Sequence, residues 1–390
     1  MVQTHLQLIG RCWQVDYQVI LIENNQLMLE RLSNVIHGTH GFTLLARYQQ
    51  AGDALGQRTM FKPNILLLDI DVKGNLALIP EFVSAFPNAA LICVSSHWDA
   101  QEAEQVAEAG AKGYMVKPFS GEELTQAVQT FGKSGMARGS EVFAFFSPKG
   151  KSGKTTLIAN LAMSLAGKSG EAVGIIDADL QFGDMAVFFN LEPKSTIVEA
   201  TRDVKFLSPI TLNSYFMPVP EAERIHVLCG TKTPEYAEMV EISSFEEMVR
   251  MAQSLFRYVL IDLPPGFNPI SIAASEIADT TYMVTMVGGG FEVLHMKRAL
   301  EVFKAWPDYE SRVKTIFTRV SPCTDEEKKV LEDEIEYPVS AILPNEYILV
   351  SAAANRGRMA VDIQPDTPLS KQLNRLSKDI MGRRIRWGES

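Results

Sequence analysis

The chain has 390 residues, a net charge of −10 and a hydrophobic fraction of 46%, as is ordinary for a soluble globular protein of two or three domains. No apolar run approaches the roughly 18 residues of a membrane span, and the N-terminus lacks the basic start and apolar stretch of a secretory signal. The acidic balance disfavours broad nucleic-acid binding, which needs a basic surface. The cysteines have no paired spacing, which indicates reduced thiols in a cytosolic protein. They are Cys12, Cys93, Cys229 and Cys323.

A stretch rich in glycine and serine, residues 132–141, divides the sequence. It lacks apolar periodicity, as linkers do. We therefore predict two domains, residues 1–134 and residues 135–390, and neither of them is basic.

The first half alternates short apolar runs with helical patterns. Such alternation predicts a parallel, doubly wound sheet, and Ser120 with Glu123 forms a capping box that predicts a helix start. Ligands of such sheets bind where the strands end, so the residues ending each run are the candidates. The runs are residues 19–22, 42–46, 65–69, 90–94 and 113–116, and the candidates are Glu23, Asn24, Asp69, Ser95 and Lys117.

Residues 17–131 resemble a response-regulator receiver domain, most specifically in GAKGYMVKPF at 110–119. The resemblance implies that Asp69 accepts a phosphoryl group, that Lys117 pairs with it and that Ser95 bonds it when a switch forms. Tyr114 matches the aromatic residue that moves with that switch.

The first strand departs from this family because it ends in Glu23-Asn24, where two acids are usual. One carboxylate is missing, which should weaken Mg²⁺ binding. Two interpretations stay open, since a fold does not carry function by itself. The domain is either a docking or dimerisation module or an active phosphoacceptor.

The second half begins with FAFFSPKGKSGKTT, residues 143–156. The sequence predicts a buried strand, a loop and a helix, whose N-terminal N–H groups form an anion nest. Lys154 would reach the β- and γ-phosphates, and the Thr155 hydroxyl would hold Mg²⁺. The predicted nucleotide-binding residues are Gly150, Lys151, Ser152, Gly153, Lys154, Thr155 and Thr156.

This loop departs from the usual G-x-x-x-x-G-K-[ST] pattern because Pro148 stands in place of the first glycine. K-G-x-x-G-K-T-T resembles the deviant Walker A loop of the ParA/MinD ATPases, which does not require glycine there. The resemblance implies that Lys149 reaches across a dimer to the partner's nucleotide. Glycine is more usual at Lys151, whose charge either lies near the phosphates or faces solvent.

Two further apolar strands end in acids, AVGIIDADLQFGD at 172–184 and YVLIDLPPGFN at 258–268. Asp262 matches a Walker B carboxylate, which holds Mg²⁺, usually through water. The resemblance implies that Asp179 orients the attacking water, that Asp177 supports the metal and that Gly266 approaches the γ-phosphate. Lys149 and Asp179 are thus the predicted catalytic residues, and Thr155, Asp177 and Asp262 the predicted metal residues.

TIFTRV (315–320) and residues 340–357 correspond to the segments that form the adenine pocket in this family. This implies base contacts from Arg319, Pro344 and Asn345. Thr318 stands where the family often has asparagine, so the contact at that position stays open.

The last predicted helix, from Pro368, carries an apolar stripe that we expect to pack on the ATPase core. The stripe is Leu369, Leu373, Leu376 and Ile380, and the basic end after it holds Arg383, Arg384, Arg386 and Trp387. Because this basic end is short, direct membrane contact is the less favoured interpretation.

Both halves in this order resemble the TadZ/CpaE family of Tad (Flp) pilus assembly. The resemblance implies a cytoplasmic homodimer that uses ATP and Mg²⁺, hydrolyses ATP slowly and acts as a hub at the cell pole or inner membrane with other pilus components. Two alternatives are a ParA-type partitioning ATPase that binds DNA and a response regulator with ATPase output. An iron–sulfur reductase is disfavoured because it needs cysteines near the switch segments.

Overall fold

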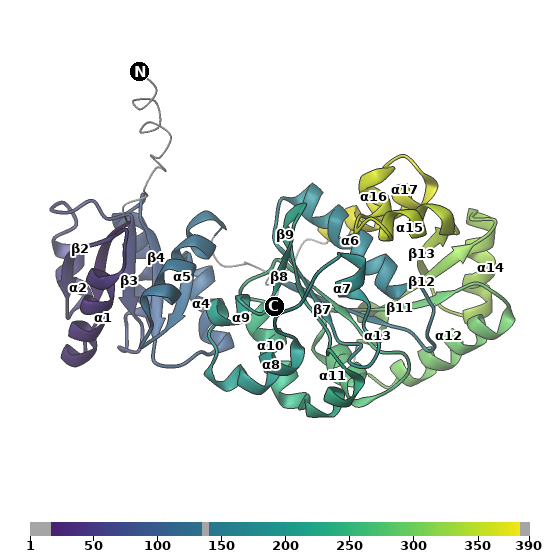
Figure 1. Ribbon diagram of the computed structural model, residues 1–390, viewed down its shortest axis with the longest axis horizontal. Coiled ribbons are helices and arrows are strands. Elements are labelled where there is room, and N and C mark those ends of the chain that lie inside the picture. Colours follow the sequence, from purple (N-terminus) through teal and green to yellow (C-terminus); the bar gives the residue numbers. More distant parts are fainter. Residues whose placement is uncertain (1–16, 135–139, 307, 383–390) are drawn as a thin grey trace, which may run out of the picture. The chain divides into compact units, whose positions relative to one another are not determined.

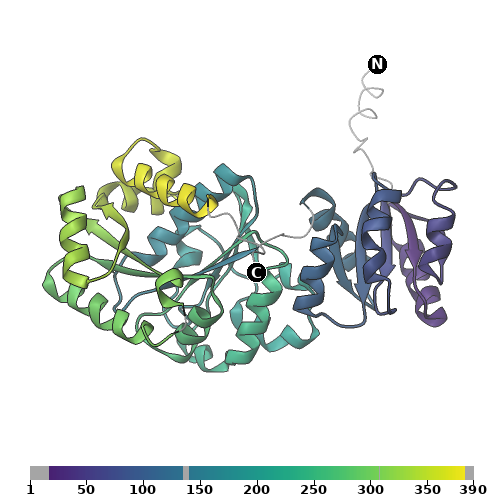
Figure 2. The same ribbon diagram turned by 180° about the vertical axis from the view of Figure 1, so that it is seen from behind.

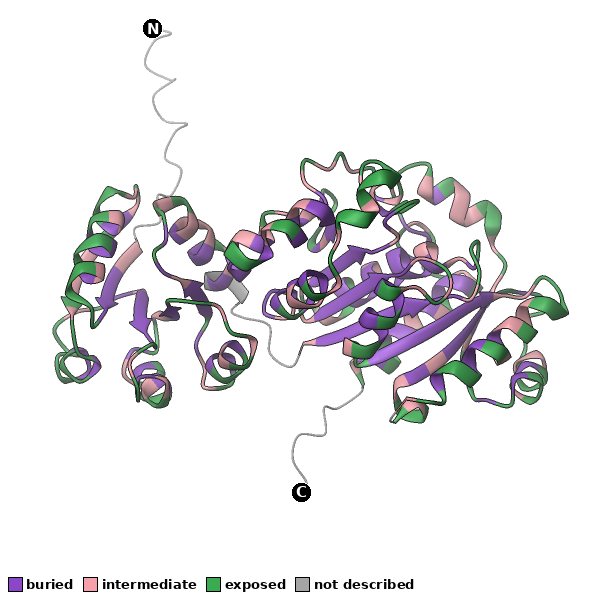
Figure 3. Cartoon of the chain, turned by 90° about the horizontal axis from the view of Figure 1, so that it is seen from below, coloured by how far each residue is buried: buried purple, intermediate pink, exposed green. Residues whose placement is uncertain are grey.

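The computed structural model describes residues 17–134, 140–306 and 308–382. Their contacts divide into two compact units, and the main division along the chain lies between residues 138 and 139. Each unit is an α/β structure around its own sheet, with buried strands (Figures 1 and 3). The doubly wound fold class predicted for both halves is confirmed.

The first unit has a five-stranded parallel sheet in the order β2-β1-β3-β4-β5. The order reverses at β1, so the crevice for a ligand lies between the ends of β1 and β3. The strands are β1 (Tyr17–Ile22), β2 (Phe42–Tyr48), β3 (Ile65–Asp69), β4 (Ala90–Ser95) and β5 (Gly113–Val116). The helices are α1 (Gln26–Gly38), α2 (Ala51–Gly56), η1 (Leu76–Leu78), α3 (Ile79–Ala85), α4 (Ala100–Glu108) and α5 (Gly121–Ser134).

The capping box predicted at the start of α5 is present. Ser120 N–H donates to Glu123 Oε2 at 2.7 Å, and Glu123 N–H donates to Ser120 Oγ at 3.2 Å. The predicted linker 132–141 is partly wrong, because α5 runs to Ser134 and β6 begins at Glu141.

The second unit has an eight-stranded sheet in the order β13-β12-β11-β6-β10-β7-β9-β8. All neighbours are parallel except β8 and β9. The strands are β6 (Glu141–Phe146), β7 (Val173–Asp177), β8 (Met217–Val219), β9 (Ala222–Leu228), β10 (Tyr258–Asp262), β11 (Thr280–Met286), β12 (Val313–Val320) and β13 (Val339–Pro344).

Helices cover both faces of this sheet (Figures 1 and 2). Its first helices are α6 (Lys154–Ser169), α7 (Met185–Phe188), α8 (Ile197–Asp203), η2 (Val204–Phe206), α9 (Pro209–Asn213), η3 (Pro234–Met239), α10 (Ile242–Ala252) and α11 (Pro269–Ile277). The others are α12 (Gly290–Phe303), α13 (Tyr309–Arg312), α14 (Asp325–Ile335), α15 (Tyr347–Ala354), α16 (Ala360–Ile363) and α17 (Pro368–Met381).

The apolar stripe of the last helix packs as predicted. Leu369, Leu373, Leu376 and Ile380 of α17 are buried in one core cluster with α6 and the central strands. The basic residues from Arg383 onward, and Cys12, lie outside the described residues. Across the described ranges, no helix combines the length and apolarity needed to cross a membrane.

Candidate nucleotide site and receiver pocket

The loop after β6 gathers donor groups at the start of α6. Gly153 has a φ of 84°, in the left-handed region that glycine adopts readily, and Lys154 is the first helical residue. Lys154 and Ser152 are buried, and Ser152 Oγ has no hydrogen-bond partner among the described residues. A buried hydroxyl without a partner is costly unless a ligand completes it. With the N–H groups of the helix start, this arrangement fits a phosphate group.

The two other lysines of the loop, Lys149 and Lys151, are exposed. The Ser147 hydroxyl donates to the Lys149 carbonyl, and Gly266 N–H donates to the Ser147 carbonyl at 2.8 Å. Lys151 has a φ of 64°, a conformation that side chains with a Cβ adopt only at a cost. The backbone geometry thus gives a physical reason why glycine would suit the position of Lys151.

Two buried carboxylates end neighbouring strands beside this loop. Asp177 ends β7 and Asp262 ends β10, and they are partners in the parallel register. Thr155 Oγ1 donates to Asp262 Oδ2 at 2.7 Å. Burial raises the pKa of Asp262 to about 6 against the opposing charge of Lys154. Burial and the charge of Asp262 raise the pKa of Asp177 well above its usual value.

A divalent cation would relieve the repulsion between these carboxylates. Among the described residues, no three His, Cys, Asp or Glu side chains are grouped to hold a metal ion by themselves. Mg²⁺ is usually held by one or two carboxylates together with substrate phosphates and water. Asp262, Asp177 and the Thr155 hydroxyl fit that kind of site.

Asp179 lies in the turn after Asp177. Its N–H donates to Asp177 Oδ1 and its Oδ1 accepts from Phe182 N–H, both at 3.3 Å. A Cβ on Gly183 would lie 2.4 Å from Asp177 Oδ2, so this position requires glycine. Met185 N–H donates to the same oxygen at 3.1 Å. The Asp177 carboxylate therefore fixes the turn, and the Asp179 carboxylate is engaged within it.

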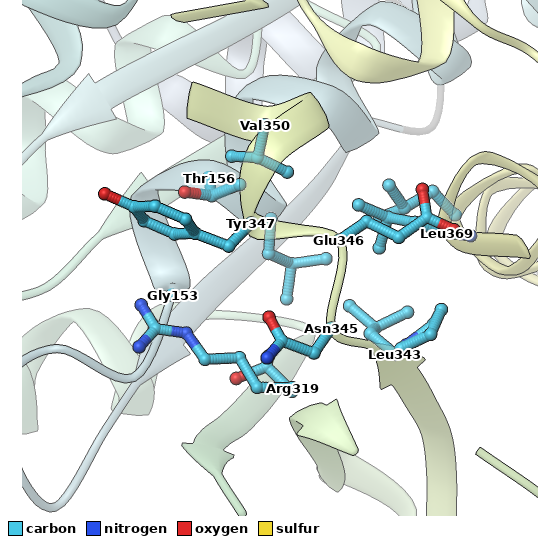
Figure 4. A pocket seen from close by; sticks show the side chains of 13 residues that line it. Gly153, Thr156, Arg319, Leu343, Asn345, Glu346, Tyr347, Val350 and Leu369 are labelled. Atoms are coloured by element: carbon cyan, nitrogen blue, oxygen red, sulfur yellow. Dashed lines mark hydrogen bonds between the residues drawn. The ribbon is translucent and has the colours of Figure 1, made fainter. Parts of the chain in front are cut away.

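A pocket lies beside the phosphate loop, between β12, β13 and α15 (Figure 4). It is lined by Arg319, Pro344 and Asn345, as the sequence predicts for a base, and by Gly153 and Thr156 of the loop. Figure 4 shows the side chains of Arg319 and Tyr347 extending to one side of the pocket, opposite Leu369. Glu346 and Tyr347, which also line it, carry no sequence signal beyond their nearness to Asn345.

Thr318, whose role the sequence leaves open, bonds to the phosphate loop. Its Oγ1 donates to the Ser152 carbonyl at 2.6 Å, and Thr318 is buried. In this structure Thr318 therefore positions the loop.

In the receiver unit, the predicted candidates Glu23, Asp69 and Lys117 meet in the crevice between β1 and β3. Lys117 Nζ lies 2.7 Å from Glu23 Oε2 and 2.7 Å from Asp69 Oδ1. It also lies 3.3 Å from Asp71 Oδ2, a carboxylate that sequence reasoning missed. Asn24 is exposed, with its N–H 3.4 Å from Asp69 Oδ2.

Ser95 bonds a carboxylate of its own chain in this structure. Its hydroxyl bonds Asp71 Oδ1 at 2.6 Å. Tyr114 is fully buried, and its hydroxyl donates to the His97 carbonyl at 2.8 Å and to Glu102 Oε2 at 2.6 Å. A signal for Asp71 was available, because a carboxylate two residues past a strand end lies at the ligand edge of a parallel sheet.

Comparison with known proteins follows the same division. Residues 19–129 match the response regulator receiver domain, and residues 139–381 match the ParA model, that of the NUBPL iron-transfer P-loop NTPases. The uncharacterized ATP-binding protein MJ0547 of Methanocaldococcus jannaschii is 26% identical over 249 residues, 61% of this chain and 87% of that protein. The septum site-determining protein MinD of Thermotoga maritima is 25% identical over 259 residues, 62% of this chain and 88% of that protein.

Among solved structures, MinD of Pyrococcus horikoshii OT3 complexed with Mg-ADP has the same fold. Its TM-score is 0.53 at 20% identity, over 62% of this chain and 96% of that chain. The match to the ParA model spans more than half of the sequence. The chain therefore belongs to the ParA family of P-loop NTPases and carries a response regulator receiver domain ahead of its NTPase domain.

Proposed function

We propose that this protein is a switch that dimerises when it binds ATP and opens after slow hydrolysis. Membership of the ParA family implies nucleotide and Mg²⁺ binding in general. The observation that carries the proposal is the buried, unpartnered Ser152 hydroxyl beside the buried Lys154 at the start of α6. A buried hydroxyl without a partner, next to a buried ammonium, is suited to an anionic ligand.

Each residue of the site has a role in this proposal. Lys154 pairs with the β- and γ-phosphates, and Thr155 with Asp262 holds Mg²⁺, which neutralises phosphate charge. The pocket at Arg319, Pro344 and Asn345 takes the base.

Hydrolysis requires the turn after β7 to rearrange. Asp179 orients the attacking water once its carboxylate leaves the Phe182 N–H, and Gly266 lies where the γ-phosphate is sensed. The nucleotide then shifts the population between two assemblies.

The surface around Lys149 supports a face-to-face dimer. The loops after β6, β7, β10 and β11 leave one edge of the sheet, because parallel strands end together. Besides the exposed Lys149 side chain, these loops and the first turn of α12 carry three phenylalanines, whose exposed fractions are 74% for Phe182, 41% for Phe267 and 75% for Phe291. Large exposed apolar side chains near one another are typical of protein interfaces. A second copy would cover them and bring each Lys149 to the other's phosphates.

The cellular role we propose is that of a hub in Tad (Flp) pilus assembly, in the cytoplasm at the pole or the inner membrane. The support is the order of the two domains and the resemblance of both to the TadZ/CpaE family. In this role the receiver domain provides a second surface for docking or self-association.

Sedimentation of the full chain with ADP, with ATP and with a non-hydrolysable ATP analogue, each with and without Mg²⁺, tests the switch. We expect a dimer with the analogue and Mg²⁺ and a monomer with ADP. A dimer that is the same in all conditions would contradict the proposal. ATP-dependent binding to DNA that weakens steeply with salt would favour the partitioning alternative instead.

Lys149→Ala tests the contact across the dimer. We expect nucleotide binding close to that of the parent, with loss of the analogue-induced dimer and of hydrolysis. The matched control is Lys168→Ala, an exposed lysine at the other end of α6. Dimerisation and hydrolysis of Lys149→Ala at the parent's level would refute the role of Lys149.

A further inference from the structure

In the receiver unit, the carboxylate of Asp71 is bound by a hydroxyl, a backbone N–H and an ammonium group, all of which can bind an oxyanion. It accepts from the Ser95 hydroxyl at 2.6 Å and from Ser96 N–H at 3.0 and 3.1 Å, and it lies 3.3 Å from Lys117 Nζ. A hydroxyl, a backbone N–H and an ammonium are the donors that proteins use to hold an anion. Although burial raises the pKa of Asp71, the bonds from Ser95 and Ser96 bring it below its usual value.

Charge around Lys117 also disfavours a second anion. One ammonium serves the carboxylates of Glu23, Asp69 and Asp71. A phosphoryl group on Asp69 would replace the single carboxylate charge by about two negative charges on the phosphoryl oxygens. It would need the same Ser95 hydroxyl and Lys117 ammonium that Asp71 already engages.

The segment between β4 and α4 is held on both sides by these contacts. Ser95 and Ser96 are bonded to Asp71, and the His97 carbonyl accepts from the buried Tyr114 hydroxyl. The segment is therefore fixed by groups of the chain itself, with no added ligand.

We infer that Asp71 is a resident ligand of an oxyanion pocket made by Ser95, Ser96 N–H and Lys117, and that it excludes a phosphoryl group from Asp69. Residues 95–97 are thus held by Asp71 and Tyr114 without any modification of Asp69. This inference is independent of the nucleotide site. Removal of the Asp71 carboxylate turns the pocket into a site for an external oxyanion.

Acetyl phosphate with Mg²⁺ is the covalent probe, applied to the full chain. In the reaction, an Asp69 carboxylate oxygen bonds to phosphorus while the bond from phosphorus to the acetate oxygen breaks, and acetate leaves. Intact mass should show no phosphoryl adduct on the parent and an adduct on most chains of Asp71→Ala. The adduct should disappear in Asp71→Ala combined with Asp69→Asn.

Amide hydrogen exchange of residues 95–97 gives a second readout, with inorganic phosphate as the probe. We expect exchange about tenfold faster in Asp71→Ala, as for loss of one hydrogen bond to a charged group, and partial recovery of protection with phosphate. The isosteric Asp71→Asn, which keeps an acceptor but no charge, should be intermediate. Glu104→Ala, which removes an exposed carboxylate of α4, should behave as the parent.

The phosphoryl adduct and the amide exchange together test the inference about Asp71. An adduct on the parent as abundant as on Asp71→Ala would overturn the inference. So would an Asp71→Ala protein that remains folded but gains neither the adduct nor a response to phosphate.

Discussion

The two units place similar groups at similar places but leave them in different states. In each, a buried lysine and carboxylates lie where parallel strands end. In the NTPase unit, the buried Ser152 hydroxyl has no hydrogen-bond partner among the described residues, and the buried Lys154 lies close to it in the sequence, at the start of α6. In the receiver unit, Lys117 contacts three carboxylates of its own chain.

A buried lysine at a sheet edge therefore does not by itself indicate a phosphate site. What matters is whether the chain supplies its own anion. Asp71 occupies the donors in the receiver unit, whereas the Asp177–Asp262 pair lies beside the phosphate loop with raised pKa values. The first site is neutralised by groups of its own chain, whereas the second has carboxylates that a bound cation would neutralise.

Removal of the Lys117 ammonium from the receiver unit should have the largest effect on stability. Lys117→Met leaves three buried or half-buried carboxylates without their ammonium. Loss of one partner of a buried ion pair typically costs about 3–5 kcal/mol, so we expect an unfolding free energy of the receiver unit lower by about that amount. Denaturant unfolding measures it.

The control for this stability prediction is Lys112→Met, which removes an exposed lysine of the same unit and should change little. If Lys117→Met is as stable as the parent, the carboxylates are not held by Lys117.

Removal of Lys154 from the phosphate loop should mainly affect nucleotide binding. Lys154→Ala deletes the charge that we propose to pair with the phosphates. Such a buried charge pair is worth about 2–5 kcal/mol, so nucleotide affinity should fall by a factor of roughly 100 or more. Calorimetric titration with ADP and Mg²⁺ measures this. Stability without nucleotide should change much less than in Lys117→Met.

Lys168→Ala, at the far end of α6, should bind nucleotide as the parent does. Equal affinity of Lys154→Ala and the parent would mean that the loop does not hold the phosphates through this side chain.

The smallest expected change in stability concerns the backbone of the phosphate loop at Lys151. Lys151→Gly removes the cost of about 1 kcal/mol that a side chain incurs in the left-handed region, offset in part by the greater freedom of glycine in the unfolded chain. We expect a gain of a few tenths of a kcal/mol, measured as a small rise of the unfolding midpoint. A clear loss of stability would show that the Lys151 side chain makes a contact that outweighs its backbone cost.

Much of this arrangement could be predicted from local sequence. Parallel strands end at one edge, so runs ending in Glu23 and Asp69 had to place these acids near each other. The Ser120–Glu123 capping box and the stripe of α17 depend on spacings of three and four residues.

The rest depends on side-chain directions that packing decides. Ser95 turns to Asp71, 24 positions away, and Thr318 turns to Ser152, 166 positions away. No periodicity relates such residues, because each bond forms only after distant strands have paired.

The bond from Thr318 to Ser152 has a consequence for the order in which the protein matures during synthesis. The phosphate loop and its helix leave the ribosome long before β12, and Asp262, the partner of Thr155, lies 107 positions after it. The loop therefore lacks its distant anchors until most of the chain has been made. A nascent chain released before residue 318 would contain every residue of the Walker A sequence and still lack the hydrogen bond that holds it in place.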